Sequence, residues 1–184
     1  LYLLLMEFSQ NDNNNLPLTK FESMLKTNNV LFFDSEEFEN IIHHYLNQGK
    51  VALAKKAIKL GLEQHPTSVN LRLFRVEVYI FENHLDKADS LLNELYIIDP
   101  LNEEIYIQKA NIFSKQDNHA KAVDVLKKAL EFAEDTTDLY SLIGMEYLFL
   151  EQFENAKDFF WTDEGIKPMY LFNCISHFKN VEMY

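Results

Sequence analysis

An alanine recurs at a constant interval of 34 residues in this chain, and this spacing restricts the fold more than any other feature. The four positions are Ala54, Ala88, Ala122 and Ala156. An aromatic column has the same period: Tyr45, Tyr79, Phe113 and Tyr147. A third column is always large and apolar: Ile58, Leu92, Leu126 and Phe160. Independent columns with one period predict a stack of similar units rather than a single irregular core.

Each unit has the sequence signals of two helices. In the first unit, Glu37 follows Asp34 by three residues, which is the spacing of a reciprocal N-terminal helix cap. Apolar residues then recur at helical spacing, and Gly49 is expected to stop the first helix. Pro66 is expected to end the second helix, because proline cannot continue the helical hydrogen-bond ladder. The corresponding column is Pro66, Pro100, Glu134 and Pro168.

The alanine column has a steric explanation. Paired helices cross at interaxial distances of about 8–10 Å, which depend on the side chains at the contact. A methyl group at this position lets the two helices of a unit approach each other, whereas a leucine would push them apart. The aromatic column is then expected to fill the space beside that close contact.

These columns resemble those of the tetratricopeptide repeat family, whose unit is about 34 residues long. The resemblance implies an all-α fold, a right-handed superhelical α-solenoid of antiparallel helix pairs. It places four repeats, at residues 35–68, 69–102, 103–136 and 137–170. In the family's small-residue column of the first helix, this chain has Ile42, Val76, Ala110 and Gly144. Arg75 and Lys109 replace the family's usual leucine, so local packing in the middle units is expected to differ.

Two flanking segments complete the predicted domain organisation. Residues 1–34 are interpreted as an N-terminal loop followed by a short capping helix over Leu18–Leu25, since the end of a solenoid needs a cap. Residues 171–184 are predicted to form a C-terminal capping helix or part of a truncated fifth repeat. The chain begins at Leu1 rather than methionine, so we interpret it either as a piece of a longer protein or as a chain with altered ends. Its native N-terminus, with any signal peptide, is then not visible.

Composition narrows the class of partner. The net charge of −12, from 29 acidic and 17 basic residues, disfavours nucleic acid and anionic membrane surfaces. No apolar run approaches the roughly 20 residues that span a bilayer. The four glycines and four prolines are few for a fold of many short strands. The single cysteine, Cys174, excludes an intrachain disulfide and favours a cytoplasmic location, with export left open.

The sequence contains no constellation that is typical of catalysis. It lacks a glycine-rich phosphate loop, a nucleophile elbow and a paired-cysteine metal motif. The adjacent His43 and His44 diverge on a helix, and Glu39 with His43 supplies only two metal ligands. Cys174 lies in an apolar stripe that is typical of a buried residue. We therefore predict a protein without enzyme activity, catalytic residues, metal or cofactor.

The resemblance implies that the first helices line a concave groove, and the candidate binding residues lie on these helices opposite the packing stripe. They are Glu39 and His43; Asn70, Phe74, Glu77 and Phe81; Glu104, Gln108, Asn111 and Lys115; and Asp138, Ser141, Met145 and Phe149. Phe81 lies beside a turn and is expected to pack into the neighbouring unit more readily than Phe74. The alternative interpretation is that the whole set is solvated helix surface.

Carboxylates and aromatic rings in this set favour a neutral or basic partner segment with a few apolar anchors. Family members that bind the C-terminal carboxylates of chaperones use Lys, Asn and Arg in the groove. Glu39 stands where a key lysine is expected, so that partner is disfavoured. The leading hypothesis is a non-catalytic protein–protein interaction scaffold that binds a peptide or protein segment in the groove. The alternative is a structural or assembly module, which forms a homo-oligomer through the terminal helix or docks within a larger parent protein.

Overall fold

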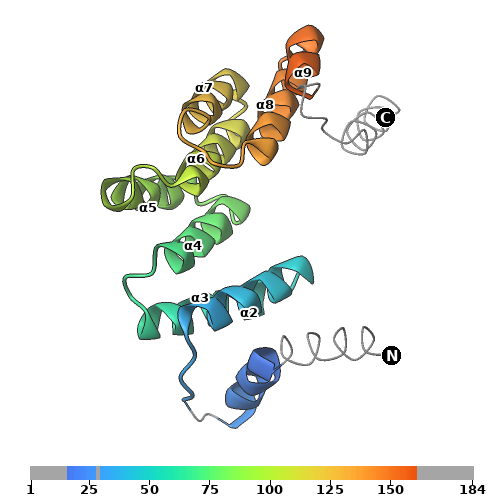
Figure 1. Cartoon of the computed structure of the whole chain (residues 1–184). Coiled ribbons are helices and arrows are strands. Elements are labelled where there is room, and N and C mark those ends of the chain that lie inside the picture. Colours follow the sequence, from blue (N-terminus) through green and yellow to red (C-terminus); the bar gives the residue numbers. More distant parts are fainter. Residues whose placement is uncertain (1–15, 28–29, 161–184) are drawn as a thin grey trace, which may run out of the picture. The chain divides into compact units, whose positions relative to one another are not determined.

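The computed structural model describes residues 16–27 and 30–160, and all regular structure in these ranges is helical, as predicted (Figure 1). The first helix covers residues 16–27. It is followed by α2 (Ser35–Asn47), α3 (Val51–Gln64), α4 (Val69–Phe81), α5 (Leu85–Ile98), α6 (Glu103–Lys115), α7 (His119–Ala129), α8 (Thr137–Phe149) and α9 (Phe153–Phe160). The chain divides within α4 into two compact units: unit 1 is Leu1–Val78 and unit 2 is Tyr79–Tyr184.

The helices α2, α4, α6 and α8 each end in a turn of the same type. One residue in each turn has a left-handed backbone, with φ of 66° at Gly49, 60° at Asn83, 56° at Asp117 and 59° at Glu151. The N–H of the following residue donates to a carbonyl of the aromatic column: Lys50 to Tyr45 (2.8 Å), His84 to Tyr79 (2.8 Å), Asn118 to Phe113 (2.9 Å) and Gln152 to Tyr147 (2.9 Å). This is the Schellman motif, which satisfies carbonyls at the end of a helix. The expected stop at Gly49 is confirmed.

The alanine column lies directly after these turns, at the start of each second helix. The N–H of each alanine donates to the carbonyl of the residue that closes the turn: Ala54 to Lys50, Ala88 to His84, Ala122 to Asn118 and Ala156 to Gln152. All four alanines are buried, with at most 1% of their surface exposed. Each small residue therefore lies buried at the start of the second helix, directly after the chain has reversed.

Unit 1 has an aromatic core. Phe21 and Met24, on the helix over 16–27, are buried in the same apolar cluster as residues of α2 and α3. The Phe21 ring meets Phe33 and Phe38 edge to face, with 5.9 and 6.3 Å between ring centroids. Aromatic quadrupoles favour this geometry. The helix over 16–27 thus contributes directly to the core of the first helix pair.

The segment before α2 is held by the end of α3. The Phe33 N–H donates to Gln64 Oε1 over 3.0 Å, and Gln64 Nε2 donates to the Leu31 carbonyl over 2.9 Å. The next residues form the predicted reciprocal cap: Glu37 N donates to Asp34 Oδ1 (2.8 Å), and Asp34 N donates to Glu37 Oε2 (3.0 Å). The start of α2 is therefore fixed both by α3 and by its own cap.

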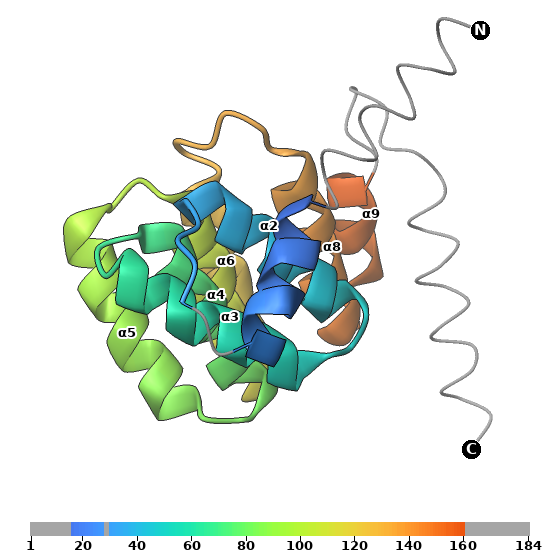
Figure 2. The ribbon, with the colours of Figure 1, turned by 90° about the horizontal axis from the view of Figure 1, so that it is seen from below.

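In unit 2, α8 and α9 lie side by side (Figures 1 and 2). A Cβ atom on Gly144 of α8 would lie 2.7 Å from the ring of Phe160 in α9, so a hydrogen atom is all that fits there. In unit 1, the corresponding columns contribute Ile42 and Ile58 to the core cluster. The smallest residue of one column is thus opposite the largest of the other, which compensates for the size variation in the small-residue column.

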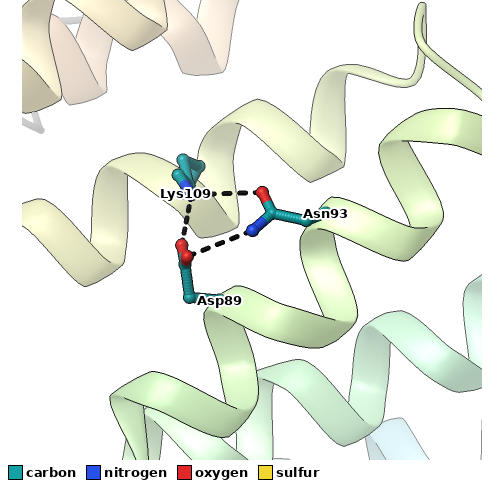
Figure 3. A network of polar contacts seen from close by, with 3 residues as sticks. All are labelled: Asp89, Asn93 and Lys109. Atoms are coloured by element: carbon teal, nitrogen blue, oxygen red, sulfur yellow. Dashed lines mark hydrogen bonds and ion pairs between the residues drawn. The ribbon is translucent and has the colours of Figure 1, made fainter.

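Lys109 of α6, which replaces the family's usual leucine, makes polar contacts with α5 (Figure 3). Its Nζ donates to Asp89 Oδ1 and, over 3.4 Å, to Asn93 Oδ1. Asn93 Nδ2 in turn donates to Asp89 Oδ2 over 3.2 Å. A polar triad thus stands between α5 and α6 where an aliphatic side chain was expected.

Candidate functional site

Candidate residues of α2 and α4 pair across the two helices within unit 1. Asn70 Nδ2 donates to both carboxylate oxygens of Glu39, over 3.3 and 3.2 Å. One turn further along, the His43 ring meets the Phe74 ring edge to face, with 4.7 Å between centroids. Both pairs span 31 residues, so the two helices run parallel, with these residues facing each other at successive turns. Residues far apart in sequence are thereby gathered into one surface.

Glu77 continues this surface one turn beyond Phe74. Its side chain as a whole is exposed, but its carboxyl group is partly enclosed by protein. Burial raises the pKa of the Glu77 carboxyl, and attraction to His43 offsets only part of that rise. We call Glu39, His43, Asn70, Phe74 and Glu77 the α2–α4 strip. It presents two carboxylates, an imidazole, an amide and a phenyl ring.

The two phenylalanines of α4 differ from expectation. Phe81 was expected to pack into the neighbouring repeat more readily than Phe74, but Phe81 is 68% exposed and Phe74 is half-buried, so the expected order is reversed. It is the last residue of α4 and follows the buried Val78 and Ile80. Phe74 is half-buried and packs against the core of unit 1. It therefore serves the core as well as the surface.

On α6, three candidate residues bond to one another. Gln108 Nε2 donates to Glu104 Oε1 over 2.6 Å, and Asn111 Nδ2 donates to Gln108 Oε1 over 3.4 Å. Gln108 is only 7% exposed, so its expected position on the surface is wrong. Its amide is bonded on both sides, which is what permits a polar group to be buried. Gln108 thus supports Glu104 and Asn111, while Lys115 at the end of α6 is exposed.

The candidates on α8 are less closely grouped. Asp138 is exposed, Met145 is half-buried, and the Ser141 hydroxyl donates to the Thr137 carbonyl over 3.1 Å. Phe149 is 48% exposed, and its ring stacks on His119 with 4.8 Å between centroids. These residues remain predicted binding positions.

Sequence reasoning missed the partner of His119. Its Nδ1 lies 2.7 Å from Glu146 Oε2, and the two side chains are 16% and 11% exposed. A buried acid is stable only when it is paired or hydrogen-bonded, which explains why the histidine is there. The pair joins α7 to α8 across 27 residues. No local spacing signals such a contact, so the sequence offered no means of finding it.

Within residues 16–27 and 30–160, no three His, Cys, Asp or Glu side chains gather closely enough to hold a metal ion. None of the helices in these ranges is long and apolar enough to cross a membrane. Cys174, Pro168 and the predicted terminal segment 171–184 lie outside the described residues.

Comparisons with known proteins agree with this architecture. The tetratricopeptide repeat family model matches residues 103–136 and 137–160. A thermophilic tetratricopeptide repeat protein of Thermus thermophilus has a similar structure, with a TM-score of 0.68, 17% identity, and coverage of 95% of this chain and 96% of that one. A tetratricopeptide repeat protein of Parabacteroides merdae has a TM-score of 0.67 and 19% identity, over 89% of this chain and 65% of that one. At these identities the likeness shows the fold.

One curated protein is similar in sequence over a shorter stretch. The BBSome complex member BBS4 of Bos taurus is 34% identical over 79 residues. This stretch is 42% of the present chain and 15% of the relative. The chain therefore corresponds to a small part of that protein.

Proposed function

Because this chain is a tetratricopeptide repeat protein, we propose that it is a non-catalytic scaffold that binds a neutral or basic segment of another protein along the α2–α4 strip. Proteins built from such repeats present extended surfaces that bind other proteins. The observation that carries the proposal is the alignment of Glu39 with Asn70 and of His43 with Phe74 on parallel helices. The exposed candidates on α6 and α8 are proposed to bind as well, with Gln108 in a supporting role.

Each side chain of the strip has a role that its contacts permit. Asn70 donates to Glu39, and its Oδ1 makes no hydrogen bond within the described part of the chain. This oxygen can accept a peptide N–H from the partner. The carboxylates of Glu39 and Glu77 attract lysine or arginine, and the edge-to-face rings of His43 and Phe74 offer a contact for an apolar anchor.

Fluorescence anisotropy tests the proposal with a labelled peptide that contains two lysines and one phenylalanine. The double variant Glu39→Gln/Glu77→Gln keeps the side-chain shapes and removes two charges. Exposed ion pairs contribute about 0.2–1 kcal/mol each, so affinity should fall about two- to thirtyfold. Added salt should weaken binding to the parent chain in the same direction. Phe74 is unsuitable for this test, because its removal would also disturb the core.

A matched control distinguishes the loss of charges at the strip from a general effect of net charge on peptide binding. Asp124 in α7 and Glu154 in α9 are both exposed, and the variant Asp124→Asn/Glu154→Gln has the same net charge as the first variant. It should bind the peptide as tightly as the parent chain does. Equal losses in both variants, or no binding to the parent chain, would contradict a site at the strip.

The assembly alternative is favoured by one observation. Phe153, at the start of the last described helix, is 66% exposed. The sequence similarity to a member of a protein complex is also compatible with a role in assembly. Sedimentation over a concentration series distinguishes the two functions, because a self-associating module gains mass with concentration. A chain that stays monomeric throughout would eliminate the homo-oligomer.

A further inference from the structure

Two cavities border α5 and α6 in unit 2, the smaller of them also bordering α7, and Asn93 and Lys109 line both. The larger cavity, of about 430 Å³, has mainly polar walls. The smaller, of about 270 Å³, is also lined by Leu92, Tyr96, Ile105, Tyr106, Val125 and Lys128. None of these residues belongs to the α2–α4 strip or to the other groove candidates. The smaller cavity is therefore a separate feature of the molecule.

Lys109, which stands where the family usually has leucine, borders the smaller cavity. The Lys109 ammonium turns toward Asp89 and Asn93, as Figure 3 shows. The side chain thereby reaches a polar partner instead of filling the space between the two helices. The cavity is open to solvent, so a side chain of a partner can enter it.

The walls of the cavity are held in place by aromatic contacts and a hydrogen bond. The rings of Tyr96 and Tyr106 meet edge to face at 6.0 Å, and Tyr106 also contacts Phe132 at 5.0 Å. The Tyr106 hydroxyl donates to the Pro100 carbonyl over 2.9 Å. This bond fixes the turn between α5 and α6 beside the cavity. The site is thus formed before any partner arrives.

Large apolar side chains are exposed on α5 and in the turn that follows it. Tyr96 is 49% exposed, Ile97 is 83% exposed, and Leu101 in the adjoining turn is 68% exposed. Ile97 lies one helical turn beyond Asn93, on the same side of α5 as the cavity. Exposed apolar side chains close to a cavity favour a partner that carries an apolar anchor.

The charges of the lining favour an acidic group on the occupant. Asp89 already neutralises Lys109. Lys128 has no acidic partner among the residues that the structure describes. Burial raises the pKa of Tyr106, and the charge of Glu131 adds to that rise, but Glu131 does not line the cavity. One ammonium group beside an apolar cavity is therefore left to bind an anion.

We propose that this cavity is a second binding site, which takes an aromatic side chain adjacent to a carboxylate from a partner segment. The volume suits one large side chain, and buried aromatic anchors carry much of the energy of an interface. Lys128 then pairs with the neighbouring carboxylate. The α2–α4 strip favours the opposite charge, so this site does not depend on the proposed function.

NMR spectroscopy of the ¹⁵N-labelled chain can test the site with two small probes. N-acetyltryptophan carries the ring and a carboxylate, and N-acetyltryptophan amide carries the ring alone. Both should shift the amide signals of Tyr106 and Lys128, and the acid should bind about two- to fivefold more tightly, as expected for one exposed ion pair. Lys128→Gln should abolish that difference. The control Lys56→Gln, at an exposed lysine of α3, should preserve it.

Two further variants examine the cavity itself. Val125→Phe should fill it and abolish binding of both probes, with binding of the lysine peptide unchanged. Tyr96→Ala removes a partly exposed wall of the cavity and should weaken the binding of both probes. This second variant keeps the test decisive if Val125→Phe does not fold. Absence of localised shifts at millimolar probe, or undiminished probe binding to Tyr96→Ala, would overturn the proposal. So would concentration-dependent association that Tyr96→Ala abolishes, since the occupant would then be a second copy of the chain.

Discussion

Replacing Gly144 with alanine tests whether the size match between α8 and α9 maintains their packing. The new Cβ would lie 2.7, 2.8 and 3.0 Å from three atoms of the Phe160 ring, which is too close for any of them. Phe160 is 5% exposed, so its ring cannot move aside without disturbing the core around it. Overpacking of this kind costs about 1–3 kcal/mol. Alanine also stabilises a helix by about 1 kcal/mol relative to glycine, so the measured loss will be smaller than the clash.

A double-mutant cycle separates these two effects. In a Phe160→Leu background the ring is absent, so Gly144→Ala should be neutral or stabilising by up to about 1 kcal/mol. The coupling between the two substitutions should therefore be about 1–3 kcal/mol, measured by urea unfolding of the four chains. Gly61→Ala is a milder control, because its Cβ would lie 3.1 Å from its nearest neighbours in Leu71 and Phe38. A coupling below about 0.5 kcal/mol would refute the inferred clash.

Four other substitutions test the turns, the alanine column and the strip. Ala122→Leu should lower the free energy of unfolding by about 1–3 kcal/mol in thermal melts, because it overpacks a fully buried position. Glu151→Gly should raise it by about 0.5–1 kcal/mol, since φ is 59° there and left-handed backbone is unfavourable for glutamate. Asn83→Gly should gain less, because asparagine tolerates this conformation. The raised pKa of Glu77 means that the folded state disfavours its ionised form, so stability is lost as pH rises through that pKa. The melting temperature of Glu77→Gln minus that of the parent chain should therefore increase from about pH 4 to about pH 7. A difference that stays constant over this range would contradict the raised pKa of Glu77.

The repeat was predictable because its columns report steric constraints that recur in each unit. Burial of all four alanines follows from one requirement, which is that the chain reverses next to them. The left-handed column was missed, although Gly49, Asn83 and Asp117 are residue types that adopt this conformation. Glutamate rarely adopts this conformation, so Glu151 hides the pattern at the fourth position. The four turns share a backbone conformation that the residue types do not all indicate.

The binding surface was only partly predictable. Glu39 and Asn70 could both be assigned to one face from their places on the first helices, but their contact spans 31 residues rather than the repeat period of 34, so the pairing itself was not predictable. The burial of Gln108 could not be predicted, since it depends on the two side chains that satisfy its amide. His119 and Glu146 show the same limit, because their contact depends on how α7 packs against α8. Periodicity determines which face a residue occupies, whereas polar partners determine whether that face is open to solvent.

Lys109 shows why a repeat protein can specialise at one position without losing its fold. The stability of stacked repeats is approximately a sum over units and their nearest neighbours, so a change at one contact weakens mainly that contact. The α5–α6 contact has a polar triad and two cavities, while α8 and α9 pack so closely that a methyl group does not fit at Gly144. The tight contacts of unit 2 can thus maintain the helical pairs while the α5–α6 contact varies. The proposed second site accordingly lies at the contact where the sequence departs from the repeat pattern.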